Sequence, residues 1–129
     1  MEKDCGNMKL IYLASPYTKH PPWIRQLFFE LQCKITADLF NRGMYAFAPL
    51  VLAHPVASRH DLPPDWEFWK EFDERLLGTC TDLWVLMFPG WEESTGVLAE
   101  IDYAQEHNIP VRYVELEEVG IKLPEGICE

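Results

Sequence analysis

The chain has 129 residues, of which 48% are hydrophobic and 25% are charged, as expected for a globular domain with a core of its own. No apolar run is long enough to cross a membrane and the first residues lack a secretory pattern, so we expect a cytoplasmic protein that does not bind a membrane. The net charge of −10 disfavours a nucleic-acid polymer as partner, because phosphate backbones bind basic surfaces. The four cysteines are widely spaced, and we predict neither a metal site nor a cofactor.

Four short apolar runs predict β-strands, at Leu10–Ala14 and at residues 44–48, 82–88 and 111–116. Three intervening segments have apolar residues at helical spacing. These are the segment between Pro22 and Gly43, residues 65–77 and residues 94–107.

Two further segments lack a sustained period. Residues 50–64 contain three prolines, so we expect a long loop of the kind that often forms a lid over a site. Residues 117–129 are acidic and predict an irregular cover or a frayed end.

Alternation of strands and helices predicts one α/β domain over residues 1–129. We expect a flavodoxin-like or Rossmann-like parallel sheet of four to five strands, in the order 2-1-3-4, with helices on both faces. Ligands bind such sheets at the carboxyl ends of the strands. Residues 15–18, 49–64 and 90–95 follow three of the strands, so we predict a small-molecule site where they meet.

Glu100 is the first candidate for that site. It lies six residues after Ser94, the expected helix cap, and borders an apolar stripe that includes Val97 and Ile101. Gly96, one turn earlier on the same face, has no side chain and leaves room for a ligand. The alternative is an exposed helical glutamate, which is the commonest fate of this residue type.

Asp73 is the second candidate, because it falls on the apolar seam of its helix in line with Trp66 and Trp69. A buried carboxyl group with a raised pKa suits a proton donor. The alternative is a seam that ends in water, or an ion pair with Lys70 or Arg75.

Other residues near the expected site have two readings each. Thr95 and Gly96 offer N–H groups that suit a phosphate, unless Ser94 merely caps the helix. Trp91 stacks on a ligand's ring or else covers the core or an interface. His54 contacts a ligand or is an ordinary residue of the expected loop.

Three blocks of the chain, IYLASPYT, DERLLGTCTD before the strand LWVLMF, and GWEESTGVLAEIDYA, resemble the nucleoside 2-deoxyribosyltransferase-like superfamily. The resemblance extends from about residue 10 to residue 115 and is nearest to a small bacterial and phage branch. It implies that Glu100 is a nucleophile and that Asp73 positions or protonates the substrate. It also implies that Tyr12, Ser15 or Tyr17 lies against a sugar.

This resemblance implies cleavage or transfer of the N-glycosidic bond of a nucleoside or nucleoside 5′-monophosphate. An ionised carboxylate traps the anomeric carbon as an ester, and a second carboxyl group protonates the leaving base. The expected catalytic residues are Glu100, Asp73 and Tyr17. The expected substrate-binding residues are Tyr12, Ser15, Pro16, His54, Gly90, Trp91, Ser94, Thr95 and Gly96.

Two other classes of protein fit the same pattern. One is a non-catalytic nucleotide-binding or signal-sequestering protein of the same fold. The other is an interaction module whose partner surface includes Trp23, Trp66 and Trp69. Because aromatic residues make up 13% of the chain, we also expect a homodimer or a higher homo-oligomer.

Overall fold

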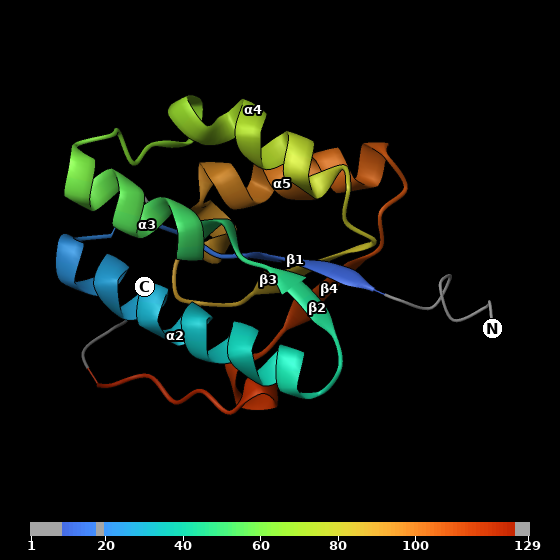
Figure 1. Ribbon diagram of the computed structural model, residues 1–129, viewed down its shortest axis with the longest axis horizontal. Helices are drawn as coiled ribbons and strands as arrows, with labels where there is room; N and C mark the ends of the chain where they lie inside the picture. Colours follow the sequence, from blue (N-terminus) through green and yellow to red (C-terminus); the bar gives the residue numbers. More distant parts are fainter. Residues whose placement is uncertain (1–8, 18–19, 126–129) are drawn as a thin grey trace.

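The computed structural model describes residues 9–17 and 20–125. They form a four-stranded, all-parallel sheet with the order β2-β1-β3-β4 and helices on both faces, which confirms the predicted α/β fold (Figure 1). The strands are β1 (Leu10–Ala14), β2 (Tyr45–Phe47), β3 (Asp82–Leu86) and β4 (Val111–Val114).

The two central strands are apolar because both of their faces are covered. In β1, Tyr12 is in register with Phe47 of β2 on one side and with Leu83 of β3 on the other. Every residue of β1 after the first is buried, which is why this strand reads as a continuous apolar run.

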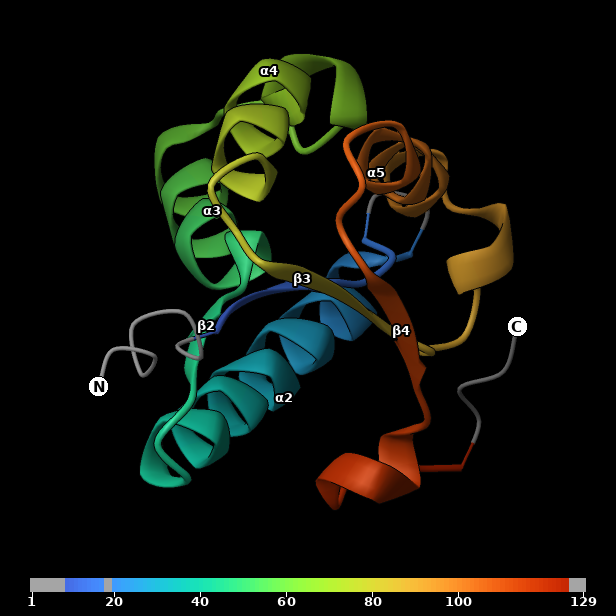
Figure 2. The same cartoon turned by 90° about the vertical axis from the view of Figure 1, so that its right-hand side faces the viewer.

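The sheet divides the core into two layers, and helices cover each of them. Helix α2 (Pro22–Asn41) lies on one face of the sheet, whereas α4 (Trp66–Leu77) and α5 (Thr95–Glu106) lie on the other (Figure 2). Because side chains alternate along a strand, Ile11 and Leu13 of β1 pack with α2, and Tyr12 and Ala14 pack with α5. This alternation directs Tyr12 towards Glu100.

The prediction of a long loop at residues 50–64 is wrong, because residues Pro49–His60 form helix α3. Pro49 occupies the first turn, where its missing N–H removes no helical hydrogen bond. Pro55 lies inside the helix, where a proline removes one such bond.

Packing explains why α3 forms despite Pro55. Leu50, His54 and Ala57 recur at helical spacing on one face and are buried. The helix packs against α2 and ends at His60, and the C-cap residue Asp61 adopts a left-handed conformation with φ of 60°. Burial of this face outweighs the local cost of the proline.

The C-terminal segment covers the sheet on the α2 side, in agreement with the irregular cover that the sequence predicts. A short 3-10 turn, η2 (Leu116–Val119), precedes Ile121, which is 4% exposed and belongs to the core on that face. Residues 126–129 of the predicted tail lie outside the described residues. Within the described parts of the chain, no helix is long and apolar enough to cross a bilayer.

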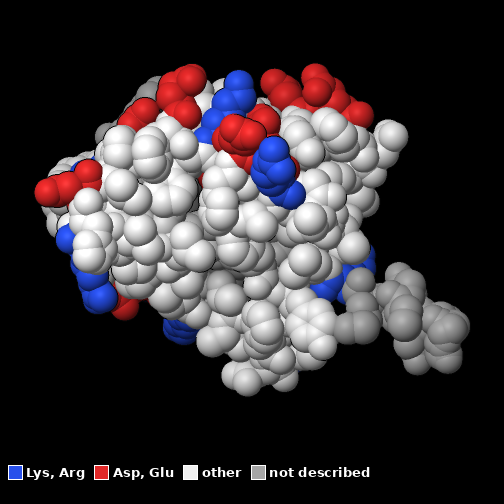
Figure 3. Space-filling view, turned by 45° about the horizontal axis from the view of Figure 1, so that its top comes forward, with Lys and Arg blue, Asp and Glu red and all other residues white. Residues whose placement is uncertain are grey.

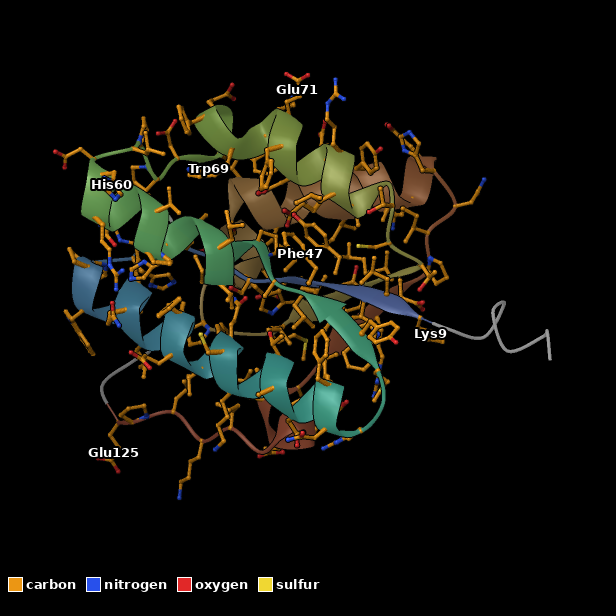
Figure 4. All side chains as sticks on the ribbon, in the orientation of Figure 1. Lys9, Phe47, His60, Trp69, Glu71 and Glu125 are labelled. Carbon is orange, nitrogen blue, oxygen red and sulfur yellow. The ribbon has the colours of Figure 1, made fainter. Side chains whose placement is uncertain are left out.

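The carboxyl ends of the strands point towards α3. Figure 4 shows the two ends of the molecule, with Lys9 beside the start of β1 and His60 at the end of α3. β2 leads directly into α3, and β3 leads through the Gly90 turn to η1 (Trp91–Glu93) and α5. Gly90 has a φ of 90°, a conformation that favours glycine.

Candidate active site

A cavity of about 80 Å³ lies at the carboxyl ends of the strands, where the site was predicted. The end of β1, helix α2 and helix α3 line it on one side, and α4 and α5 line it on the other. We call it the inner cavity. Its polar side chains include Ser15, Tyr17, Gln32, Asp73, Ser94 and Glu100.

Glu100 is only 5% exposed, so the prediction that it faces away from bulk solvent is confirmed. Ser94 caps α5 by accepting a hydrogen bond from the N–H of Val97 at 3.3 Å. The buried stripe of α5 then holds Glu100 beside the sheet, where the Tyr12 hydroxyl donates a 2.5 Å hydrogen bond to its Oε2. Strand β1 and helix α5 together orient the carboxyl group.

Burial and the nearby charge of Asp73 raise the pKa of Glu100 to about 8, against the opposing effect of the Tyr12 hydrogen bond. Burial raises the pKa of Asp73 to about 7. Two nearby buried carboxyl groups do not both ionise readily, so the pair retains about one proton near neutral pH. The expected assignment, with Glu100 ionised and Asp73 protonated, is therefore one of two arrangements of this proton.

Asp73 is 8% exposed on α4, as its place in the apolar seam predicts. The alternative ion pair with Arg75 does not form, because Arg75 pairs with Glu71 at 3.3 Å. Asp73 Oδ1 is buried and has no hydrogen-bond partner among the described residues. A buried carboxyl oxygen of this kind is costly unless a ligand or solvent molecule satisfies it.

The two tryptophans of the seam line the inner cavity. Trp69 lies between α3 and α4 (Figure 4), and its Nε1 donates a 2.7 Å hydrogen bond to the carbonyl oxygen of Pro63. The Trp66 ring lies over Gly96, so close that an added Cβ would be 3.3 Å from it. The room predicted beside Gly96 is therefore occupied largely by Trp66 rather than left to a ligand.

Gln32 is the inner-cavity residue that the sequence analysis missed. It is fully buried on α2, and its Nε2 donates a hydrogen bond to Ser15 Oγ. The signal in the sequence is a glutamine in the apolar stripe of α2, between Phe28 and Ile35 at helical spacing. That position normally holds an apolar residue.

His54 holds the side chain of Tyr17 in place through a hydrogen bond. The Tyr17 hydroxyl lies 2.6 Å from His54 Nδ1, and His54 Nε2 lies 2.8 Å from Gln26 Oε1. The Gln26 amide donates to Glu30, so its oxygen accepts the proton of His54 Nε2 and Tyr17 donates to Nδ1. Burial and Arg25 lower the pKa of His54, which favours this neutral ring.

His54 therefore holds Tyr17 in place, and it lines a separate cavity with Tyr17 rather than the inner one. Tyr17 itself lines the wall of the inner cavity, as predicted. His60, the other histidine of the segment, is exposed at the end of α3.

A larger cavity of about 490 Å³ adjoins the inner one, and the two share Tyr17, Asp65, Trp66, Ser94 and Gly96. We call it the outer cavity. Three further predicted residues, Pro16, Gly90 and Thr95, line the outer cavity but not the inner one.

His20, which the sequence analysis did not single out, also lines the outer cavity and lies 2.9 Å from the carbonyl oxygen of Pro89 through its Nε2. Trp91 instead packs against Tyr113 of β4, with ring centroids 5.4 Å apart, in agreement with the core-covering alternative.

The outer cavity is acidic. Asp65, Glu67 and Glu93 line it, whereas no Lys or Arg is found among its described lining residues. A phosphate at the start of α5 would lie near these carboxylates, which oppose the attraction of the helix N–H groups.

The fold and the site define a Rossmann-like parallel α/β protein with two buried carboxyl groups at the carboxyl edge of its sheet. The chain belongs to the family described as Domain of unknown function (DUF1937), whose model matches residues 9–116. All the residues of the inner cavity fall within this match. The comparison with curated proteins finds no match.

Proposed function

We propose that the protein cleaves or transfers the N-glycosidic bond of a nucleoside or nucleoside 5′-monophosphate, with Glu100 as the nucleophile. The observation that carries the proposal is the placement of the buried Glu100 and Asp73 side chains on one cavity, with Tyr12 holding Glu100 Oε2 at 2.5 Å. Two carboxyl groups that line one cavity are suited to nucleophilic attack and proton transfer at a sugar. The resemblance of the three sequence blocks supports the same chemistry.

In the proposed reaction, Glu100 attacks C1′ of the sugar and forms a glycosyl ester while the C1′–N bond breaks. Asp73 gives its proton to the departing base. Water or a second base then attacks C1′, the ester bond breaks to restore the Glu100 carboxylate, and Asp73 takes up the proton that the attacking group loses. Tyr17 forms part of the wall against which the sugar lies.

The shared proton suits this sequence of steps. Positive charge that develops at C1′ is stabilised by an ionised carboxylate facing it, so the reactive form has Glu100 ionised and the proton of the pair on Asp73 before the bond breaks. The Tyr12 hydrogen bond also favours the Glu100 anion.

The two cavities fit different parts of the substrate. About 80 Å³ beside the carboxyl groups admits only the reacting part of the sugar, whereas about 490 Å³ outside it falls within the usual range of small-molecule sites. The Asp65 and Glu67 carboxylates of the outer cavity favour an uncharged nucleoside over a nucleoside monophosphate.

Incubation with a panel of nucleosides and nucleoside 5′-monophosphates, followed by chromatography for free base, tests this function. We expect base release from at least one nucleoside, at a higher rate than from its monophosphate. Absence of release across the panel would contradict the proposal.

A second candidate is a non-catalytic protein that binds a nucleotide or nucleoside. The pKa of about 8 at Glu100 favours it, because a protonated carboxyl group donates a hydrogen bond but does not attack carbon. A ligand that binds and is recovered intact from the same panel would support this candidate.

We also propose a homo-oligomer, through the outer surface of α3 and α4. Leu52 and Val56 are exposed one turn apart on α3, and Phe68 and Phe72 are exposed one turn apart on α4. Figure 3 shows Asp and Glu side chains along the upper margin of the face turned to the viewer, above a broad area without charged groups. Exposed apolar surface of this kind is typical of an interface.

A further inference from the structure

We propose that Gln32 binds a hydroxyl group of the ligand's sugar through its amide oxygen, and thereby decides which sugars the site accepts. This inference rests on the proposed function, because it takes the ligand to be a nucleoside. It assigns a specificity-determining role to a residue that the reaction itself does not use.

Gln32 is a polar side chain held where the helix needs an apolar one. Its exposed fraction is 0%, and burying an amide group without partners costs free energy. Its Nε2 is satisfied by Ser15 Oγ, but its Oε1 is buried without a hydrogen-bond partner among the described residues. The side chain lines the inner cavity, so a ligand bound there is the group that can satisfy the oxygen.

The hydrogen bonds of Ser15 support this orientation of the amide group. Ser15 Oγ lies 3.5 Å from the carbonyl oxygen of Pro16, which accepts the hydroxyl proton. The Ser15 oxygen then accepts from Gln32 Nε2, and this leaves the Gln32 oxygen as the acceptor at the cavity. The site therefore requires a donor from the ligand at this point.

The position of Gln32 indicates that it contacts the sugar of the ligand rather than the base. Gln32 reaches the inner cavity from α2, whereas Asp73 and Glu100 reach it from α4 and α5 on the other face of the sheet (Figure 2). If C1′ lies at Glu100, the atoms that fit the remaining space of about 80 Å³ are the neighbouring carbons of the sugar and their hydroxyl groups. Asp73 Oδ1, the second unpartnered oxygen, lies on the same cavity.

Calorimetric titration in the Glu100→Gln background measures binding without turnover. The ligands are the four ribonucleosides with their 2′-deoxy, 3′-deoxy and corresponding fluoro forms. We expect one hydroxyl group to contribute roughly tenfold or more in Kd. Its fluoro form should bind as weakly as the deoxy form, because fluorine does not donate a hydrogen bond.

Adding Gln32→Met should weaken the binding of only the hydroxylated ligand. The ratio of the Kd of the deoxy form to that of the hydroxylated form should then fall close to one. Thr36→Val is the matched control, because Thr36 Oγ1 is also buried and unpartnered one turn further along α2 but does not line the inner cavity. It should leave the preference unchanged. The fluoro series needs no change at Gln32, so the requirement for a hydrogen-bond donor on the ligand is tested even if Gln32→Met does not fold.

Three results would overturn the proposal. These are equal weakening of every ligand by Gln32→Met, a fluoro form that binds as well as the hydroxyl form, and absence of nucleoside binding. The Kd pattern is independent of catalysis. If wild-type protein cleaves nothing but the pattern appears, the glycosidase proposal fails and the role of Gln32 stands.

Discussion

The hydroxyl group of Tyr12 donates a 2.5 Å hydrogen bond to Glu100 Oε2 and joins the central strand to the helix that carries the proposed nucleophile. Tyr12 is fully buried, and burial together with the nearby carboxyl groups raises its own pKa, so it remains a donor. The bond fixes the direction of the Glu100 carboxyl group and lowers the pKa of Glu100 against the effect of burial. The first prediction concerns this bond.

Tyr12→Phe should reduce kcat/KM for base release by roughly 10- to 100-fold, because it removes a hydrogen bond to a charged group. The pKa of Glu100 should rise further, so the limb of the pH profile that lies near pH 8 should move to higher pH. Tyr113→Phe, at an exposed tyrosine of β4, is the matched control and should change neither quantity. If the limb near pH 8 does not move in Tyr12→Phe, the bond does not tune Glu100.

The pair of carboxyl groups predicts a narrow, bell-shaped pH dependence of kcat/KM. Activity requires one proton on the pair, so it should be highest between the pKa values of about 7 for Asp73 and about 8 for Glu100. Asp73→Asn should abolish the alkaline limb, because that limb reports loss of the shared proton. A profile that is flat from about pH 5 to about pH 9 would be inconsistent with a coupled pair.

The sheet and the burial of the two carboxyl groups were predictable because both follow from periodicity. The four apolar runs correspond to the four strands, and the placement of Glu100 and Asp73 beside apolar stripes correctly indicates burial. These features depend on residues close together in the chain, whose spacing fixes which face they share. The sequence alone is therefore sufficient to predict these features.

Features that depend on packing between distant segments were not predictable. Helix α3 forms against the local preference of Pro55 because its buried face packs on α2. Gly96 receives the ring of Trp66, a contact that its spacing from Glu100 does not reveal. Gln32 acquires its unpartnered oxygen only when the end of β1 meets the middle of α2.

The raised pKa of Glu100 also predicts the dependence of stability on pH. The folded protein binds the Glu100 proton more tightly than the unfolded chain does, so stability falls as pH rises from the ordinary value of 4.5 towards about 8. Glu100→Gln removes this titration. The variant should exceed wild type in free energy of unfolding by on the order of 2 kcal/mol at about pH 9 and by much less near pH 4.

Chemical denaturation across this pH range measures the difference between the two proteins. Asp102→Asn, at an exposed position on the same helix, is the control and should show no comparable gain at high pH. If Glu100→Gln is less stable than wild type at about pH 9, the carboxyl group is not a buried, destabilising charge in the folded protein.

The proposed oligomer predicts a change of mass on substitution of α4. Wild-type protein should elute as a dimer or larger species at micromolar concentration, measured by light scattering. Phe68→Glu should give a folded monomer, because a buried unpaired charge opposes association. Phe40→Glu, at a similarly exposed phenylalanine of α2, should leave the mass unchanged. A wild-type monomer would contradict this proposal.

The most direct test of the central claim is the rate at which wild-type protein and Glu100→Gln release free base from the same nucleoside. Glutamine preserves the shape of the side chain and can still accept the Tyr12 hydrogen bond, but it lacks the attacking anion. Glu100→Gln should therefore fold normally and lose activity by several orders of magnitude, as removal of a covalent nucleophile does in other enzymes. Equal rates for the two proteins would contradict the assignment of Glu100 as nucleophile.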